Sequence, residues 1–215
     1  MARPLITGLE VDVVRENLRA IQEEVGPGVE VLAATKYVAR EETGVLVEAG
    51  VRVFGENRAQ DLAVKHADHP DLTWDFIGQL QSRKVKQVLP LVRYVHSVAT
   101  DSALEQLARH GTPDTQVLVQ VNIAREPGKA GVDPDELPAF LERAAGGPFS
   151  VVGLMTMPPL AQRPEDNARW FAALRELAER HGLRELSMGT SQDYAVAARE
   201  GATIVRIGAR LYTRQ

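Results

Sequence analysis

The sequence predicts a single (β/α)8 barrel, and three observations lead to that prediction. Eight short β-rich segments alternate with helical segments along the chain, the count that a closed barrel of parallel strands requires. The 215 residues suit one sizeable domain and are few for two. A doubly wound open sheet would usually carry a glycine-rich turn after its first strand, but KYVARE follows the first strand here.

An extra helix over residues 11–25 is predicted before the barrel, because its apolar residues recur at helical spacing up to Gly26-Pro27. Eight candidate strands follow, at 29–35, 51–54, 73–77, 93–98, 116–121, 149–154, 184–188 and 203–207. The helical segments between them span 40–49, 57–67, 81–89, 102–110, 135–145, 164–181 and 191–200. No linker or shift in composition interrupts this order, so we expect one domain over residues 1–215.

Composition excludes several classes of function. The formal net charge of −4 offers no basic field for nucleic acid. Cysteine is absent, which excludes disulfides, thiolate nucleophiles and thiolate metal sites. No signal peptide and no apolar run of about 20 residues is found, so we expect a cytoplasmic protein without a membrane span.

Lys36 ends the first candidate strand, in the run VEVLAATK. Barrels of this kind carry their chemistry at the C-terminal strand ends, and lysine is rarely buried without a reason. Burial lowers the pKa of a lysine and frees its amine to attack an aldehyde, so Lys36 is a candidate Schiff-base residue. The alternative is a strand-end lysine whose ammonium group simply extends to solvent.

Small residues follow the last two strands. SMGTS at 187–191 leads into a helix with Ser191 or Thr190 as its predicted N-cap, and RIGAR at 206–210 follows the eighth strand. Barrels commonly bind phosphate between these two loops, through backbone N–H groups. Plain helix capping is the alternative, and Asp193 argues against a nearby phosphate unless it points outward.

The eighth and first strands become neighbours when a barrel closes. An aldehyde-bearing phosphate ester would join the amine to the anion site, and pyridoxal 5′-phosphate (PLP) is the obvious molecule. Arg206 falls beside this site, where the pyridine nitrogen could lie, and a guanidinium there disfavours a protonated ring. This predicts a poor electron sink and weak or narrow catalysis. Alternatively, Arg206 pairs with a core carboxylate such as Glu56.

Other signals are weaker. His66 and His69 have a spacing seen in metal sites but lack a third ligand, so no metal is predicted. His96 ends a strand and is interpreted as a rim histidine with satisfied hydrogen bonds rather than a base. The basic segment 82–86 is either a solvated face or a second anion site.

Several motifs together resemble one known family. With Lys36 these motifs are FGEN, FIGQLQSRK, HSV, QVNI…EPGKAG, GLMTM, SMGTSQDY and VRIG, in order over residues 29–210. They are similar to those of the pyridoxal phosphate homeostasis proteins, the YggS-type family. The family usually has methionine at Thr190, proline at Gln79 and asparagine at Arg83. None of these differences touches Lys36 or Arg206, and Thr190 bears only on the fine shape of the phosphate wall.

The resemblance implies a barrel similar to the N-terminal domain of alanine racemase, with the cofactor as an internal aldimine on Lys36. The cofactor-binding residues that it implies are Lys36, Asn57, Met188, Gly189, Ser191, Arg206, Gly208 and Ala209. It also implies a monomeric or weakly associating protein that binds PLP and acts in intracellular vitamin B6 and amino-acid homeostasis, with little or no turnover. PLP-dependent apoenzymes are candidate partners, and Lys84, Lys86 or Lys129 are candidates for assisting release.

An amino-acid racemase is the alternative function. Racemisation needs acid–base groups on both faces of the substrate carbon. In similar racemases one of these groups is a tyrosine from an additional domain of a partner subunit, and this sequence ends soon after the eighth strand. Neither Tyr37 nor Tyr194 can be assigned that role from sequence. A phosphosugar barrel enzyme with an aldolase-like Lys36 is a third reading and the least favoured.

Overall fold

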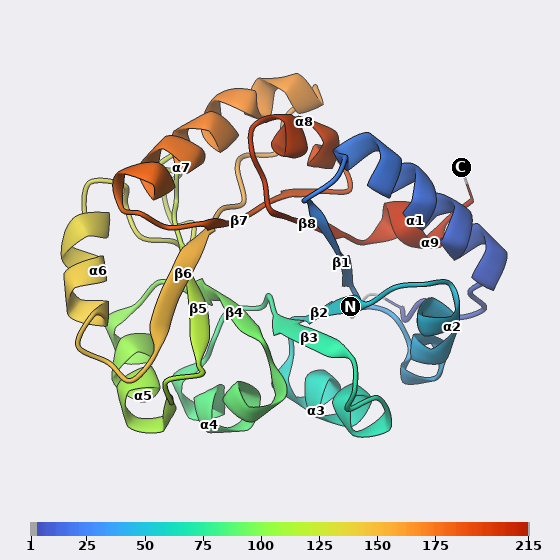
Figure 1. Cartoon of the computed structure of the whole chain (residues 1–215), viewed down its shortest axis with the longest axis horizontal. Coiled ribbons are helices and arrows are strands. Elements are labelled where there is room, and N and C mark those ends of the chain that lie inside the picture. The colour runs from blue at the N-terminus through green and yellow to red at the C-terminus, as the bar shows by residue number, and fades with distance from the viewer. Residues whose placement is uncertain (1–3, 215) are drawn as a thin grey trace.

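The structure, a computed structural model, describes residues 4–214 and confirms the (β/α)8 barrel. Eight parallel strands close in sequence order, and the last pairs with the first (Figure 1). The strands are β1 Glu30–Ala34, β2 Val53–Glu56, β3 Thr73–Phe76, β4 Tyr94–Val98, β5 Gln116–Gln120, β6 Ser150–Met155, β7 Glu185–Thr190 and β8 Ile204–Ile207. All eight predicted strands are confirmed, with small shifts at their ends.

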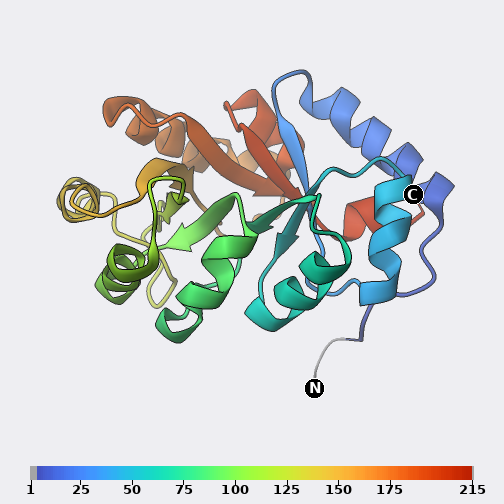
Figure 2. The same ribbon diagram turned by 60° about the horizontal axis from the view of Figure 1, so that its bottom comes forward.

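Helices surround the strands on the outside (Figures 1 and 2). They are α1 Val11–Val25, α2 Thr43–Glu48, α3 Ala59–Asp68, α4 Val85–Val88, α5 Asp101–His110, α6 Leu137–Ala144, α7 Ala168–Arg180, α8 Tyr194–Arg199 and α9 Ala209–Tyr212. The core fills the layer between helices and strands, because in each strand alternate side chains point outward. A smaller cluster of Leu32, Val53 and Ile204 fills part of the barrel interior.

The predicted extra helix is α1, with Val14, Leu18, Ile21 and Val25 on its buried face. It packs beside α2, α8 and α9, across the outside of the β8–β1 pair. The Asn17 amide donates to the carbonyl oxygen of Leu211 at 3.2 Å and to that of Thr213 at 2.9 Å. The two ends of the described chain are therefore joined where the barrel closes.

Three helical predictions need correction. The segment 81–89 holds only one α-helical turn, α4, between the 3₁₀ turns Ser82–Lys84 and Leu89–Leu91. The helix after β7 begins at Tyr194, so neither Ser191 nor Thr190 caps it. The four-residue α9 after β8 was not predicted.

Candidate functional site

Lys36 lies in a turn just beyond β1, on the face of the barrel where all strands end. Its side chain is half-buried. Within residues 4–214 its ammonium group has no carboxylate and no hydrogen-bond acceptor, and its recorded contact is the Tyr37 ring, whose centroid is 5.3 Å from Nζ. The amine is therefore free to react with a ligand in the barrel mouth.

The backbone around Lys36 is held from three sides. The Thr35 N–H donates to the carbonyl oxygen of Gly55 at 2.9 Å, the Lys65 ammonium to that of Thr35 at 2.8 Å, and the Tyr212 hydroxyl to that of Ala34 at 3.1 Å. These bonds come from β2, α3 and α9, so three separate elements fix the direction in which Lys36 leaves the strand. Fixed geometry of this kind is what a reactive side chain requires.

Glu56 is fully buried at the end of β2 and is neutralised by Lys65. The Lys65 Nζ–Glu56 Oε1 distance is 2.5 Å, and the Thr35 hydroxyl donates to the same oxygen at 2.8 Å. This pair settles one open alternative, since Glu56 does not pair with Arg206. Lys65 was not singled out by the sequence, because it lies on a helix whose exposed face also carries charges.

Arg206, on β8, is buried without a carboxylate partner among the described residues. Its Nη1 donates to the Ser187 hydroxyl at 2.5 Å and its Nη2 to the carbonyl oxygen of Thr156 at 2.9 Å, both neutral acceptors. Burial lowers the pKa of Arg206 to about 10, so it stays protonated at neutral pH. A buried charge of this kind is costly unless something else in the site uses it.

The loops after β7 and β8 meet, as predicted for an anion site. The Gly208 N–H donates to the Ser191 hydroxyl at 3.0 Å, and a Cβ built on Gly208 would find only that oxygen, at 4.0 Å. The N–H groups of Ser191 and Ala209 have no acceptor within residues 4–214. The hydroxyl proton of Ser191 and these N–H groups make a donor set that suits a phosphate.

Asp193 points away from that donor set. Its Oδ1 accepts from the Thr190 N–H at 2.7 Å, and its Oδ2 accepts from the Asn167 amide at 2.8 Å. These bonds shape the turn between β7 and α8, which is why the helix begins later than predicted. The acidic residue therefore does not contradict an anion between the two loops.

Met188 and Gly189 support the loop after β7 by their packing, and the Met188 side chain does not point into the barrel mouth. Ser187 faces the barrel interior, so the next residue, Met188, points outward and packs fully buried in the main core. Gly189 has a φ of +90°, and a Cβ there would lie 2.5 Å from the Cβ of Ala197. Glycine is needed at position 189 because a larger side chain would prevent the loop from packing on α8. Direct contact of Met188 or Gly189 with a ligand stays a prediction.

Asn57 lies beside the mouth, next to Glu56. Its side-chain oxygen is buried and has no hydrogen-bond partner among residues 4–214. Buried polar atoms are nearly always paired, so this atom fits a site that a ligand completes. Asn57 also lines a hollow of about 230 Å³ with the cationic side chains of Arg58, Arg83 and Lys84, where a second anion site remains a prediction.

The remaining signals lie outside this constellation. No group of three metal-ligating side chains is found in the part of the chain that the structure describes, and His66 and His69 lie at the end of α3. Lys86 is exposed on α4, whereas Lys129 pairs with Glu126 and donates to the carbonyl oxygen of Pro158 at 3.0 Å. No helix among residues 4–214 is long and apolar enough to cross a membrane.

The sequence analysis placed His96 on the rim, and this was wrong: the side chain is fully buried inside the barrel. Its hydrogen bonds are satisfied, as expected, by Ser187 and Asp75. Neither partner was predicted from the sequence, although Asp75 stands out as an acidic residue within the apolar run TWDFI. Charged residues inside such a strand are the signal that could have revealed this buried network.

Comparisons with known proteins agree with this geometry. Residues 9–215 match the family described as alanine racemase, N-terminal domain. The pyridoxal phosphate homeostasis protein of Aquifex aeolicus is 36% identical over 214 residues, covering 93% of this chain and 94% of that protein. That of Pseudomonas aeruginosa is 41% identical over 173 residues, covering 76% and 75%.

A solved structure gives the same answer. The structure of PipY from Synechococcus elongatus with PLP bound has a TM-score of 0.82 and 32% identity, covering 93% of this chain and all of that one. The similarity therefore covers nearly all of this chain. The chain therefore belongs to the pyridoxal phosphate homeostasis protein family and is built on the alanine racemase N-terminal barrel.

Proposed function

We propose that this protein binds PLP covalently through Lys36 and acts in PLP and amino-acid homeostasis. The observation that carries the proposal is a pair of cations, Lys36 and Arg206, that have no carboxylate partner among the described residues. Lys36 follows β1 and Arg206 lies on the neighbouring strand β8, beside the loop donors at Ser191 and Ala209. An amine, a buried guanidinium and an anion site together match the aldehyde, ring nitrogen and phosphate of PLP.

The chain's own residues would divide the work as follows. Ser191, Gly208 and Ala209 would bind the phosphate, Lys36 would supply the attachment point, and Arg206 would face the ring nitrogen. Asn57 offers its unpaired oxygen beside the ring, and the backbone of Met188 and Gly189 shapes the wall. When bound, PLP supplies a carbonyl that holds amines and a ring that withdraws electrons.

The same residues support a carrier rather than a racemase. Arg206 keeps a positive charge where a racemase of high turnover would profit from a protonated ring, and a guanidinium cannot supply that proton. Two of the tyrosines are committed elsewhere, since Tyr194 donates to Glu24 at 2.6 Å and Tyr212 to the Ala34 carbonyl at 3.1 Å. Neither is positioned as the second acid–base group that racemisation needs.

The attachment is tested with purified protein. We expect wild-type protein incubated with PLP to be yellow and, after borohydride reduction, to carry a pyridoxyl mass on the peptide that contains Lys36. Lys36→Ala protein should lose this mass, while Lys86→Ala, a change at an exposed lysine on α4, should retain it. Labelling of Lys36→Ala to the same extent at another lysine would contradict the proposal.

The carrier assignment has its own test. We expect D- and L-alanine incubated with the loaded protein to keep their chirality, apart from turnover far below the usual 1–10³ s⁻¹ of enzymes. Arg206→Glu should raise racemase-like side reactions, because a carboxylate there favours a protonated ring. Ordinary enzymatic turnover by the wild-type protein would instead favour the racemase.

We further propose that the protein works as a cytoplasmic monomer and passes PLP to apoenzymes. The transfer is supported by the position of Lys36, which is half-buried rather than sealed from solvent. Size-exclusion chromatography tests the monomer, and transfer from loaded protein to a PLP-free enzyme, faster than spontaneous release, tests direct delivery.

A further inference from the structure

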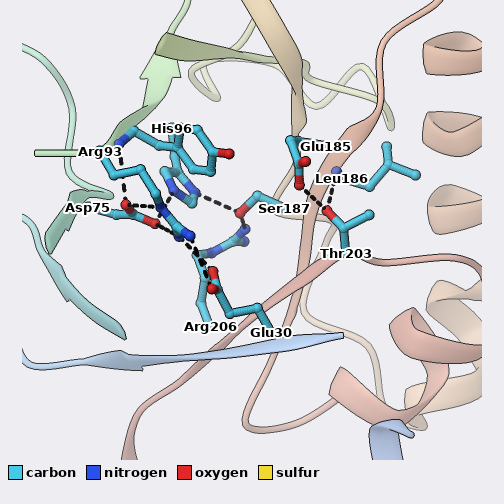
Figure 3. Close-up of polar contacts among 10 residues, drawn as sticks. Glu30, Asp75, Arg93, His96, Glu185, Leu186, Ser187, Thr203 and Arg206 are labelled. Atoms are coloured by element: carbon cyan, nitrogen blue, oxygen red, sulfur yellow. Dashed lines mark hydrogen bonds and ion pairs between the residues drawn. The ribbon is translucent and has the colours of Figure 1, made fainter. Parts of the chain in front are cut away.

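A chain of hydrogen bonds behind Arg206 crosses the interior of the barrel (Figure 3). It begins with Ser187, whose hydroxyl oxygen lies 2.5 Å from Arg206 Nη1 and 2.8 Å from His96 Nδ1. A guanidinium only donates, so Ser187 accepts from Arg206 and its single hydroxyl proton is left for His96. If Nδ1 of His96 carries no proton, the Ser187 hydroxyl donates to it.

His96 passes the chain on to Asp75. Its Nε2 lies 3.1 Å from Asp75 Oδ2, and both side chains are fully buried. Burial lowers the pKa of His96, whose charged neighbours are Asp75, Arg93 and Arg206, so the ring is neutral at pH 7. Because an ionised carboxylate only accepts, the single proton of the neutral ring lies on Nε2 and is donated to Asp75, which leaves Nδ1 to accept from the Ser187 hydroxyl.

Asp75 connects the chain to the opposite end of the barrel. Arg93 donates to both of its oxygens, at 3.0 and 2.7 Å, and also to Glu30, at 3.0 and 2.6 Å (Figure 3). Arginine 93 is partly exposed, whereas Asp75 is fully buried. Two positive and two negative side chains thus alternate, with neutral Ser187 and His96 between the first positive charge and the first negative one.

A serine, a histidine and an aspartate in hydrogen-bond contact are also the parts of a hydrolase triad, but this arrangement does not suit that use. Ser187 is fully buried, and the positive Arg206 occupies its acceptor side. Such a hydroxyl is out of reach of a substrate and is a poor nucleophile. The arrangement instead orients the Ser187 oxygen as an acceptor for Arg206, and the carboxylate of Asp75 ends the chain behind it.

We propose that Ser187, His96 and Asp75 are positioning residues that hold the Arg206 guanidinium for the cofactor. Asp75 sets the tautomer of His96, His96 sets the direction of the Ser187 hydroxyl, and Ser187 fixes one edge of Arg206. Asp75 does not contact Arg206 directly and so takes none of its N–H groups. Two of the five N–H groups donate to Ser187 and to the Thr156 carbonyl; the other three lack an acceptor within residues 4–214 and remain for a ligand. This inference rests on the proposed binding of PLP.

Ser187→Ala tests the role, with Ser97→Ala as the matched control. Ser97 is also buried, lies on β4 next to His96, and donates to the carbonyl oxygen of Gly78 rather than to this chain. We expect Ser187→Ala to raise the Kd for PLP about tenfold, as loss of one hydrogen bond to a charged group does, and to shift the absorption maximum of the bound cofactor. Ser97→Ala should leave the absorption maximum in place, even where its melting temperature falls.

A second measurement needs no cofactor. In PLP-free protein, ¹⁵N NMR of the His96 ring should show a neutral ring protonated on Nε2, and Asp75→Asn should move the proton to Nδ1, because an asparagine can donate to Nε2. Arg93 keeps Glu30 as a partner in that variant. A ring protonated on Nδ1 in the wild-type protein would contradict the proposed chain.

The outcomes separate the two proposals. If wild-type protein takes up no PLP, the proposed function is wrong, and so is this role. If wild-type protein binds PLP while Ser187→Ala shows the same Kd and the same spectrum, only the positioning role is wrong. Equal spectral shifts in Ser187→Ala and Ser97→Ala would also contradict it, because they would indicate a general loosening of the barrel.

Discussion

Lys65 and Arg206 are two buried cations near the same barrel mouth, and they are treated in opposite ways. Lys65 lies 2.5 Å from the fully buried carboxylate of Glu56, and it also donates to a backbone carbonyl. Among the described residues, Arg206 has only a hydroxyl and a carbonyl as acceptors, and the carboxylate that ends its hydrogen-bond chain, Asp75, lies beyond Ser187 and His96. Lys65 is neutralised by a carboxylate of the protein itself, whereas the charge of Arg206 remains available to a ligand.

The difference separates structure from function within one small region. A paired buried ion is costly to break but contributes no binding capacity. A buried ion without a direct partner reduces the stability of the ligand-free protein and is retained where a ligand uses it. Burial alone would have assigned both residues to the same class.

The largest effect should come from breaking the paired cation. Lys65→Met leaves Glu56 buried without a counter-charge, and we expect the free energy of unfolding to fall by about 3–5 kcal/mol, measured by urea denaturation. The double variant Lys65→Met/Glu56→Gln should recover most of that loss. Equal destabilisation in single and double variants would show that packing, not charge, explains the effect.

The other cation should behave in the reverse manner. Arg206→Met removes a desolvated charge along with two hydrogen bonds, so we expect the unfolding free energy of PLP-free protein to change by no more than about 1 kcal/mol. PLP affinity should fall at least about tenfold in a titration followed by absorbance. Arg52→Met, a change at an exposed arginine, serves as control. A stability loss as large as that of Lys65→Met would remove the contrast.

Stability should also depend on pH through His96. Its pKa is lowered from 6.5 by burial, so the unfolded chain takes up the proton first as pH falls. Stability is therefore complete above pH 6.5 and declines below it, by up to about 1.4 kcal/mol per pH unit. His96→Asn should flatten this decline between pH 6.5 and 5. Asp75, whose pKa is also lowered, loses its contribution only below about pH 3.9.

The smallest effect is expected at the far end of the hydrogen-bond chain. Glu30 and Arg93 are both about one-third exposed, so their ion pair is screened by water. Glu30→Gln should lower the unfolding free energy by less than about 1 kcal/mol, because Arg93 keeps Asp75 as a partner. High salt should reduce even this difference. A larger loss would show that this end also helps to hold Arg206.

The fold could be predicted from the sequence because the strands are continuous apolar runs. QVLVQV and TIVRI are buried on both faces, and such runs separated by amphipathic helices favour a parallel barrel. The short α9 was missed, because ARLY has four residues and no capping signal. The turn at 191–193 was not predicted. The Thr190 N–H donates to the Asp193 carboxylate there, and helix periodicity gives no sign of such a local hydrogen bond.

The positions of the candidate site residues in the fold could be predicted from the sequence, but their side-chain pairings could not. Lys36, Ser191, Gly208 and Arg206 follow from position at strand ends, since a closed barrel brings those ends together. Which carboxylate neutralises which cation depends on how the side chains lie in the folded barrel, and the spacing of apolar residues does not specify that. Glu56 was considered for Arg206, yet it pairs with Lys65, nine residues away and on the same side of the barrel.

The hydrogen bond from Tyr212 to Ala34 joins residues separated by 178 positions, and β8 must be present before β1 gains its second neighbour. During synthesis on the ribosome, the lysine emerges early and the wall that orients it emerges last. A nascent or truncated chain therefore carries the reactive amine without the assembled pocket. Selective capture of the coenzyme begins only when the barrel closes.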